Sequence, residues 1–212
     1  HVRSRRQRQM CIRDRHDVML FSDAGKAVRF DENDVRPMGR TARGVRGMNL
    51  GEGHQVIAML VAPAEAAEGA EAAVVDPNGL AIPSSVLTAT ENGFGKRTPI
   101  GEYTRHGRGT KGMIAIQTTE RNGKVVAAAL VSPEDQIMLI TTGGILVRTR
   151  VSEIREMGRA TQGVTLINVD EGTRLSGLQR IAESDSDDEG DLEDGEDGDP
   201  ASDSNPDEAG DA

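Results

Sequence analysis

The apolar residues of this chain fall into short runs, without the sustained 3.6-residue period of amphipathic helices. Many of the runs are rich in β-branched residues, and turn sequences such as DAG, ENG, GEG and RNG separate them. Runs of this kind bounded by such turns are typical of β-hairpins. The pattern therefore predicts an all-β fold.

The runs recur as three copies of one unit, which is visible when Gly25, Gly93 and Gly144 are placed in register. The offsets are 68 and 51 residues, and the larger one contains an Ala/Glu/Pro-rich insert at 62–85. The other matching positions are Arg29, Arg97 and Arg148; Asp34, Glu102 and Glu153; Val35, Tyr103 and Ile154; Gly39, Gly107 and Gly158; Arg40, Arg108 and Arg159; and Gly44, Gly112 and Gly163. The underlying unit is about 45 to 50 residues long.

Each unit contains four predicted strands. They are 18–21, 27–30, 45–50 and 56–61 in the first unit, 86–90, 96–98, 113–117 and 125–131 in the second, and 137–141, 145–149, 164–169 and 175–181 in the third. Four strands at this period are typical of a propeller blade. Because each blade buries its faces only against its neighbours, three adjacent blades are about the minimum for a shared core.

The repeat divides the chain into three blades and three flanking or inserted segments. These are a basic leader (1–15), the first blade (16–61), an inter-blade surface loop (62–85), the second blade (86–131), the third blade (132–183) and an acidic tail (184–212). The leader is expected to be disordered or non-native, the alternative being a basic nucleic-acid arm. The tail is expected to be disordered, because it has too few apolar residues to offset the entropy of ordering.

Composition narrows the class of protein further. The 212 residues include no Trp, one Tyr and three Phe, so the core must consist of aliphatic residues and Met. A single cysteine excludes a disulfide within one chain, which suits a reducing cytosol. No apolar stretch approaches the roughly 18–20 residues that cross a bilayer, so no membrane contact is predicted.

The net charge of −10 hides an uneven distribution of charge. From Glu183 onward there are 15 Asp or Glu and no Lys or Arg, whereas the windows 26–46, 96–111 and 148–159 together hold 15 basic and 6 acidic residues. Because the windows are equivalent parts of a repeat, their cations should form a basic stripe along one edge. The candidate DNA-binding residues are Lys26, Arg29, Arg36, Arg40, Arg43, Arg46, Lys96, Arg97, Arg105, Arg108, Lys111, Arg148, Arg150, Arg155 and Arg159.

Such a stripe suits the phosphates of a bent DNA duplex, whose counterions it would release. Without a recognition helix the contacts should be independent of sequence. Bending a 20–30 base-pair segment costs of order 1–6 kcal/mol, so many contacts are needed. The alternative is an ordinary solvated surface, in which Arg29, Arg97 and Arg148 pair with the acids at 34, 102 and 153. Charge alone does not decide between the two.

No catalytic or cofactor site is predicted. Tyr103 registers with Val35 and Ile154, so it should be a core residue and not a nucleophile. The sequence GRGTKG fits a dinucleotide-binding pattern, but its repeat partner GRATQG breaks that pattern and no βαβ unit surrounds it. Four scattered histidines and one cysteine lack the spacing of a metal site.

The chain resembles the C-terminal domain of the DNA gyrase A protein. The matching segments include VMLFSDAGKAVRF, VRPMGRTARGVRGMNLGEG, LTATENGFGKRT, EYTRHGRGTKGMIAI, TERNGKVVAAALV and LITTGGILVRTRVSEIREMGRATQGVTLI. The likeness covers 16–183 apart from the insert. It implies a partial β-pinwheel, which is a propeller-like fold whose blades exchange strands.

The resemblance also implies a function. In this family the domain wraps double-stranded DNA about its basic rim, and the acidic tail modulates wrapping. The whole enzyme, a heterotetramer of gyrase A and gyrase B in the bacterial cytoplasm and nucleoid, introduces negative supercoils with ATP and Mg²⁺. Three of the family's six blades are present, most like the last three, and the first-blade Q-R-R-G-G-K-G box is missing. The fragment is therefore expected to bind DNA without supercoiling it. The equivalent domain of the topoisomerase IV A protein and a propeller-like protein-binding scaffold are the alternatives.

Overall fold

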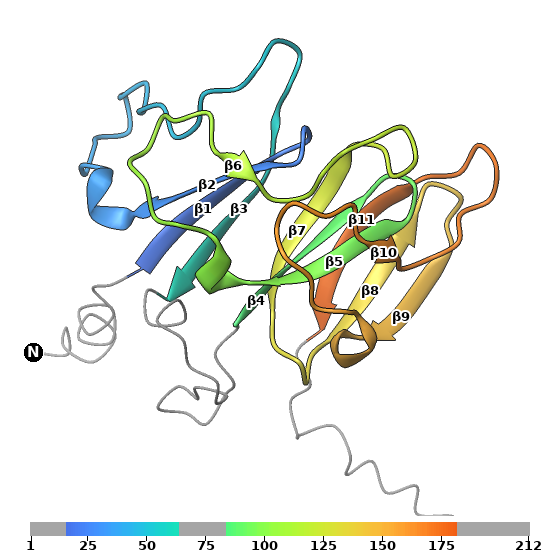
Figure 1. Cartoon of the computed structure of the whole chain (residues 1–212). Helices are drawn as coiled ribbons and strands as arrows, with labels where there is room; N and C mark the ends of the chain where they lie inside the picture. The colour runs from blue at the N-terminus through green and yellow to red at the C-terminus, as the bar shows by residue number, and fades with distance from the viewer. Residues whose placement is uncertain (1–15, 64–83, 182–212) are drawn as a thin grey trace, which may run out of the picture.

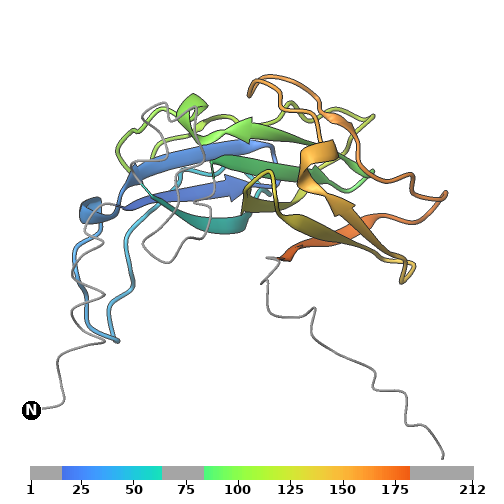
Figure 2. The same ribbon diagram turned by 90° about the horizontal axis from the view of Figure 1, so that it is seen from below.

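The computed structural model describes residues 16–63 and 84–181, which form three antiparallel β-sheets (Figure 1). The predicted leader, almost all of the predicted inter-blade loop and the predicted acidic tail lie outside the described residues. Figure 2 shows the three sheets following one another across the molecule in chain order. The predicted all-β, propeller-like fold is confirmed. In the two described ranges, no helix is long and apolar enough to cross a membrane.

Each sheet is built mainly from one repeat. The first sheet has the order β3 (Val56–Pro63), β1 (His16–Ser22), β2 (Lys26–Asp31), β6 (Met113–Ile114). The second has the order β10 (Val164–Thr165), β5 (Phe94–Pro99), β4 (Ser85–Thr90), β7 (Val125–Val131). The third has the order β11 (Leu175–Ile181), β8 (Gln136–Thr141), β9 (Leu146–Arg150). The 3-10 turns η1 (Glu32–Asp34), η3 (Ile100–Glu102) and η4 (Val151–Glu153) occupy equivalent places in the three repeats.

The short fourth strand of a sheet comes from the following repeat. Strand β6 of the second repeat pairs with β2, and β10 of the third repeat pairs with β5. The short strand of a unit therefore joins the sheet of the preceding unit, which confirms the strand exchange that the family resemblance implies. Residues 45–50 of the first repeat form no strand, and the third sheet has three strands among the described residues. The described chain holds neither a sheet ahead of the first repeat nor a repeat after the third.

Apolar side chains fill the spaces between neighbouring sheets. One buried cluster, which includes Met19, Phe21, Val86 and Ile100, joins the first and second sheets. A second buried cluster, which includes Leu87, Leu139, Val151 and Ile167, joins the second and third sheets. Burying each such side chain contributes about 1.5–3 kcal/mol, so contacts between neighbouring sheets supply much of the stability of the fold.

The single tyrosine lies in the first of these clusters, as predicted. Tyr103 is fully buried, and its ring meets Phe21 edge-to-face at a centroid distance of 6.0 Å. Burial raises the pKa of the phenol well above its ordinary value. The residue is therefore a packing residue of the first two sheets.

Candidate nucleic-acid interface

Three Gly-Arg loops, defined as residues 35–44, 103–112 and 154–163, follow the 3-10 turns. We call the contact between the first and second sheets the first junction, and that between the second and third sheets the second junction. The second Gly-Arg loop crosses the first junction, where His106 N–H donates to the Arg29 carbonyl at 2.8 Å. The third loop crosses the second junction, where Met157 N–H donates to the Arg97 carbonyl at 2.8 Å (Figure 1). The second and third loops are thus each held on the sheet before their own.

Glycines at the β-turns permit this close docking. At the first junction Ala115 N–H and Ile116 N–H both donate to the Gly25 carbonyl, at 2.8 and 3.2 Å. A Cβ at Gly25 would collide with the Ile116 carbonyl, and the backbone there has φ +74°. The second junction repeats the contact with Gly93 as acceptor. The turn glycines that revealed the repeat therefore mark where the next repeat docks.

The Gly-Arg arginines of the two docked loops make equivalent contacts. Arg108 Nη1 donates to the Arg46 carbonyl at 3.2 Å, and Arg159 Nη1 donates to the Ile114 carbonyl at 3.4 Å. Positions 46 and 114 are themselves repeat equivalents. Arg108 and Arg159 therefore occupy corresponding places on successive junctions, as the repeat predicts.

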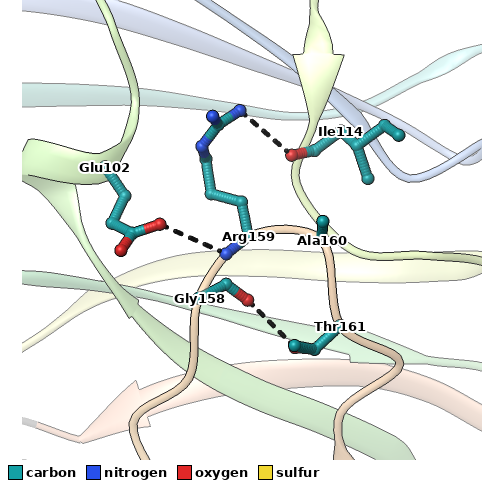
Figure 3. Close-up of a pocket in the computed structure, with 6 residues that line it drawn as sticks. All are labelled: Glu102, Ile114, Gly158, Arg159, Ala160 and Thr161. Carbon is teal, nitrogen blue, oxygen red and sulfur yellow. Dashed lines mark hydrogen bonds between the residues drawn. The ribbon is translucent and has the colours of Figure 1, made fainter.

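The surroundings of Arg159 carry both signs of charge. It lines a shallow hollow with Glu102, Ile114 and its own loop, as Figure 3 shows. A carboxylate oxygen of Glu102 accepts the Arg159 backbone N–H at 3.3 Å, while the guanidinium turns toward the Ile114 carbonyl. The half-buried side chain of Arg159 thus has less freedom to meet a ligand than the exposed Arg108.

Two of the predicted DNA-binding residues have internal roles instead. Arg29 is 3% exposed, and it pairs with buried Asp17 while donating to the carbonyls of Ile100 and Tyr103 at 3.1 and 3.0 Å. Its guanidinium therefore ties the first sheet to η3 of the second. Because a DNA phosphate cannot reach it without disrupting this junction, we revise the prediction for Arg29.

Lys96 is revised for the same reason. Its ammonium is fully buried and donates to the carbonyls of Gly158, at 2.5 Å, and Arg159, and to the Thr161 hydroxyl at 3.1 Å. Burial lowers the pKa of Lys96 to about 8. This lysine therefore holds the third Gly-Arg loop from beneath.

The alternative pairing of the strand arginines with the acids at 34, 102 and 153 does not occur among the described residues. Arg29 pairs with Asp17, which lies twelve positions earlier on the neighbouring strand. Arg97 Nε lies 3.7 Å from a carboxylate oxygen of Glu156, and Arg148 donates to Gln136. These arginines thus contact side chains of adjacent strands or of the next Gly-Arg loop. They do not contact the acids at 34, 102 and 153.

Comparison with known proteins identifies the repeat. The family model for the DNA gyrase C-terminal domain, a beta-propeller, matches residues 16–63, 84–132 and 135–182. The chain belongs to this family. It is 49% identical over 180 residues to the DNA gyrase A protein of Pseudomonas aeruginosa, covering 85% of this chain and 18% of that protein. It is 51% identical over 167 residues to the DNA gyrase A protein of Escherichia coli K12, covering 79% of this chain and 17% of that protein.

Solved structures give the same family. The structure of a DNA gyrase A C-terminal domain matches with a TM-score of 0.66 and 26% identity, over 80% of this chain and 51% of that one. The C-terminal domain of a DNA topoisomerase IV matches with a TM-score of 0.66 and 22% identity, over 79% of this chain and 47% of that one, which shows a shared fold alone. The chain spans less than a fifth of the two curated relatives.

Within this gyrase-family fold, most of the predicted cations remain at the surface. Arg97 and Arg159 are half-buried, whereas eleven of the fifteen are exposed. The exposed set is Lys26, Arg36, Arg40, Arg43, Arg46, Arg105, Arg108, Lys111, Arg148, Arg150 and Arg155. One of them, Arg105, also bridges acids of the first sheet, with 2.7 Å to Asp17 and 3.4 Å to Asp31.

Sequence reasoning missed the two acids that set the junction electrostatics. Asp17 was missed because the equivalent positions of the other two repeats hold Ser85 and Gln136, so the repeats share no acidic residue there. Glu156 was missed because its equivalent in the second repeat is the basic Arg105. A usable signal existed for Lys96, whose equivalents Val28 and Val147 are apolar and indicate an inward-facing position.

Proposed function

We propose that this chain binds double-stranded DNA along the exposed cations of its Gly-Arg loops, as the wrapping module of a DNA gyrase A protein. The observation that carries the proposal is the equivalence of Arg108 and Arg159, which contact equivalent carbonyls at successive junctions. A repeat that places cations at regular intervals suits a backbone whose phosphates also repeat. Contacts of this kind position a duplex without reading its bases.

Cleavage and passage of DNA would belong to other parts of the whole enzyme. The remainder of gyrase A, together with gyrase B, would cleave and pass DNA using ATP and Mg²⁺ in a heterotetramer at the bacterial nucleoid. Within that assembly the chain's part is to hold a bent duplex. Because bending a 20–30 base-pair segment costs of order 1–6 kcal/mol, three repeats alone should bind DNA without driving supercoiling.

The decisive experiment is fluorescence anisotropy with a labelled duplex at several salt concentrations. The wild-type chain should bind with an affinity that falls steeply as salt rises. Arg108→Gln should weaken binding and reduce the salt slope by about one. The matched control is Arg121→Gln, an exposed arginine outside the three basic windows, whose guanidinium lies 4.8 Å from the Phe94 ring centroid. Equal loss in both variants would contradict the basic windows as the binding surface, and no duplex affinity at any salt would favour the protein-scaffold alternative.

We also propose that the acidic tail competes with DNA for the exposed cations. Its 15 carboxylates from Glu183 onward carry the opposite charge to the loops. Deleting 184–212 should therefore tighten binding to linear duplex at low salt, where electrostatic competition is strongest. Unchanged affinity after the deletion would exclude this competition while leaving the DNA site itself untouched.

A further inference from the structure

The third Gly-Arg loop is fixed from beneath by two side chains of one strand, β5. The Lys96 ammonium donates to the carbonyls of Gly158, at 2.5 Å, and Arg159. Two positions further along the strand, Thr98 Oγ1 donates to the Met157 carbonyl at 2.9 Å. Both donors belong to fully buried residues. Three consecutive carbonyls of the loop are therefore turned toward the sheet and away from the open surface.

The outer side of the same loop carries its donors. Thr161 Oγ1 accepts from Lys96 Nζ at 3.1 Å and donates to the Gly158 carbonyl at 2.9 Å, so three acceptors of one loop match the three hydrogens of the ammonium. On the opposite side, the Arg159 backbone N–H donates to a carboxylate oxygen of Glu102, and the arginine side chain lines the hollow (Figure 3). The loop thus presents backbone N–H and guanidinium groups outward, as an anion would require.

The second Gly-Arg loop is held differently. The position of Lys96 is Val28 in the first repeat, where it packs in an apolar cluster and offers no side-chain donor. That loop is held by its own arginine, since Arg108 Nε donates to the Asp34 carbonyl at 3.0 Å. Nε of the equivalent Arg159 has no hydrogen-bond partner among the described residues. In the third loop, a lysine of the sheet thus replaces part of the support that Arg108 gives to the second.

The buried ammonium also places a positive charge under the loop. Burial is the main influence on this group and lowers the pKa of Lys96 to about 8. The charged groups that face it are Glu102, which favours the ammonium, and Arg159, which disfavours it, while its cross-strand neighbour Thr88 is neutral. A phosphate on the outer side of the loop would add a negative charge and favour the ammonium.

We propose that Lys96 is a positioning residue for duplex binding at the second junction. It fixes the third Gly-Arg loop so that Arg159 faces the phosphates, and its charge attracts those phosphates without touching them. Because the ammonium is buried, salt screens this attraction less than it screens the attraction of a surface cation. The inference rests on the proposed DNA binding and gives a part in it to a side chain that no phosphate reaches.

Duplex affinity should therefore depend on the protonation of Lys96. Nearby phosphates raise the pKa of the ammonium, so near pH 8 and above the complex binds a proton that the free chain has released, and affinity falls as pH rises. The stability of the chain changes in the opposite direction. The folded state has the lower pKa, so stability rises over the same pH range. Unfolding therefore cannot cause the loss of affinity.

Fluorescence anisotropy with a labelled duplex, from pH 7.5 to 9.5 at constant ionic strength, tests the proposal. All chains carry Cys11→Ser, which removes a thiol that titrates in this range. The otherwise wild-type chain should lose about three- to sixfold in affinity as pH rises. Lys96→Met should bind more weakly at pH 7.5 and show little further loss. No fall in affinity without the Lys96 substitution would overturn the proposal.

Thr98→Val is the matched control, because it removes a neutral bond to the same loop from the same strand. It should weaken binding by loosening the loop but keep the wild-type dependence on pH. A Lys96→Met chain with a native circular dichroism spectrum and the wild-type pH profile would overturn the inference while leaving the proposed DNA binding intact. Loss of the pH dependence in Thr98→Val would overturn the role of the charge. Absence of duplex binding at every pH would overturn both proposals.

A double-mutant comparison tests whether Lys96 acts through the third loop alone. Lys96→Met combined with Arg159→Gln should weaken binding by less than the product of the two single losses, because both changes affect one loop. Lys96→Met combined with Arg108→Gln should lose about that product, because Arg108 belongs to the loop that the lysine does not support. Independent effects in both pairs would overturn the positioning role.

Discussion

The two junctions of this molecule share their backbone contacts but differ in the origin of the acid that pairs with the strand arginine, Arg29 or Arg97. At the first junction the acid is Asp17, on the strand beside Arg29, and the next repeat contributes a second cation, Arg105. At the second junction the strand position holds Ser85, and the acid Glu156 comes from the next repeat. The repeat thus determines where the backbone docks, whereas the acid that pairs with the strand arginine can come from the same repeat or from the next one.

The two solutions differ in burial. The side chains of Arg29 and Asp17 are 4% and 0% exposed, whereas those of Arg97 and Glu156 are 14% and 49% exposed. A buried ion pair that loses one partner leaves an uncompensated charge, but an exposed pair contributes little. The first junction should therefore depend far more on its acid than the second.

The largest expected effect comes from removing the buried acid. Asp17→Asn should lower the free energy of unfolding by about 3–5 kcal/mol, because Arg29 remains buried without a counter-charge. Glu156→Gln, the corresponding change at the second junction, should cost less than about 1 kcal/mol. Urea unfolding followed by far-ultraviolet circular dichroism measures both. Losses of similar size would show that burial does not separate the two junctions.

The next effect belongs to Lys96, which only the second junction has. The folded state holds the pKa of Lys96 near 8, below the ordinary 10.5, because burial disfavours the ammonium. Between these values the unfolded chain binds the proton and the folded chain releases it, so stability rises with pH. From about pH 7.5 to about pH 9.5 the rise should be about 2 kcal/mol, and it should be absent in Lys96→Met.

The pH range of that experiment has an upper limit set by the first junction. Burial raises the pKa of the Tyr103 phenol, so the unfolded chain ionises first and folding loses stability above about pH 10. Denaturant midpoints measured below that pH separate the two residues. A wild-type curve parallel to that of Lys96→Met would contradict the role assigned to the lysine.

An effect of similar size distinguishes a docked turn from an open one. Gly25 and Gly144 have similar positive φ angles, +74° and +81°, so an alanine strains both backbones alike. Only at Gly25 does the new Cβ meet a docked carbonyl. Gly25→Ala should therefore cost about 1–3 kcal/mol more than Gly144→Ala in dilute solution, measured by thermal unfolding. Equal costs would mean that the strain of the turn, and not the docking, requires glycine.

The sequence predicts the repeat, the strands and the buried Tyr103 because, for each of them, equivalent positions of the three units hold residues of similar character. It does not predict which sheet a short strand joins, since the run at 113–117 looks the same whether it pairs within its own blade or with the one before. It also overestimates the binding surface, because a count of charge treats the buried Lys96 and the exposed Lys111 alike. Ion-pair partners are hardest to predict, because Asp17 and Glu156 are not at equivalent positions of the repeat unit.

The smallest expected effect tests whether the charge arrangement can be transplanted. Ser85→Asp with Glu156→Arg would give the second junction the arrangement of the first, with the acid on the strand and a cation from the next repeat. Ser85→Asp alone places two acids on Arg97, and Glu156→Arg alone leaves two cations without an acid. The double variant should therefore be more stable than the sum of the single changes by about 0.5–1 kcal/mol, a coupling measured by a double-mutant cycle. If the two changes were additive, Arg97 would not be the shared partner of both positions, and the comparison between the junctions would rest on burial alone.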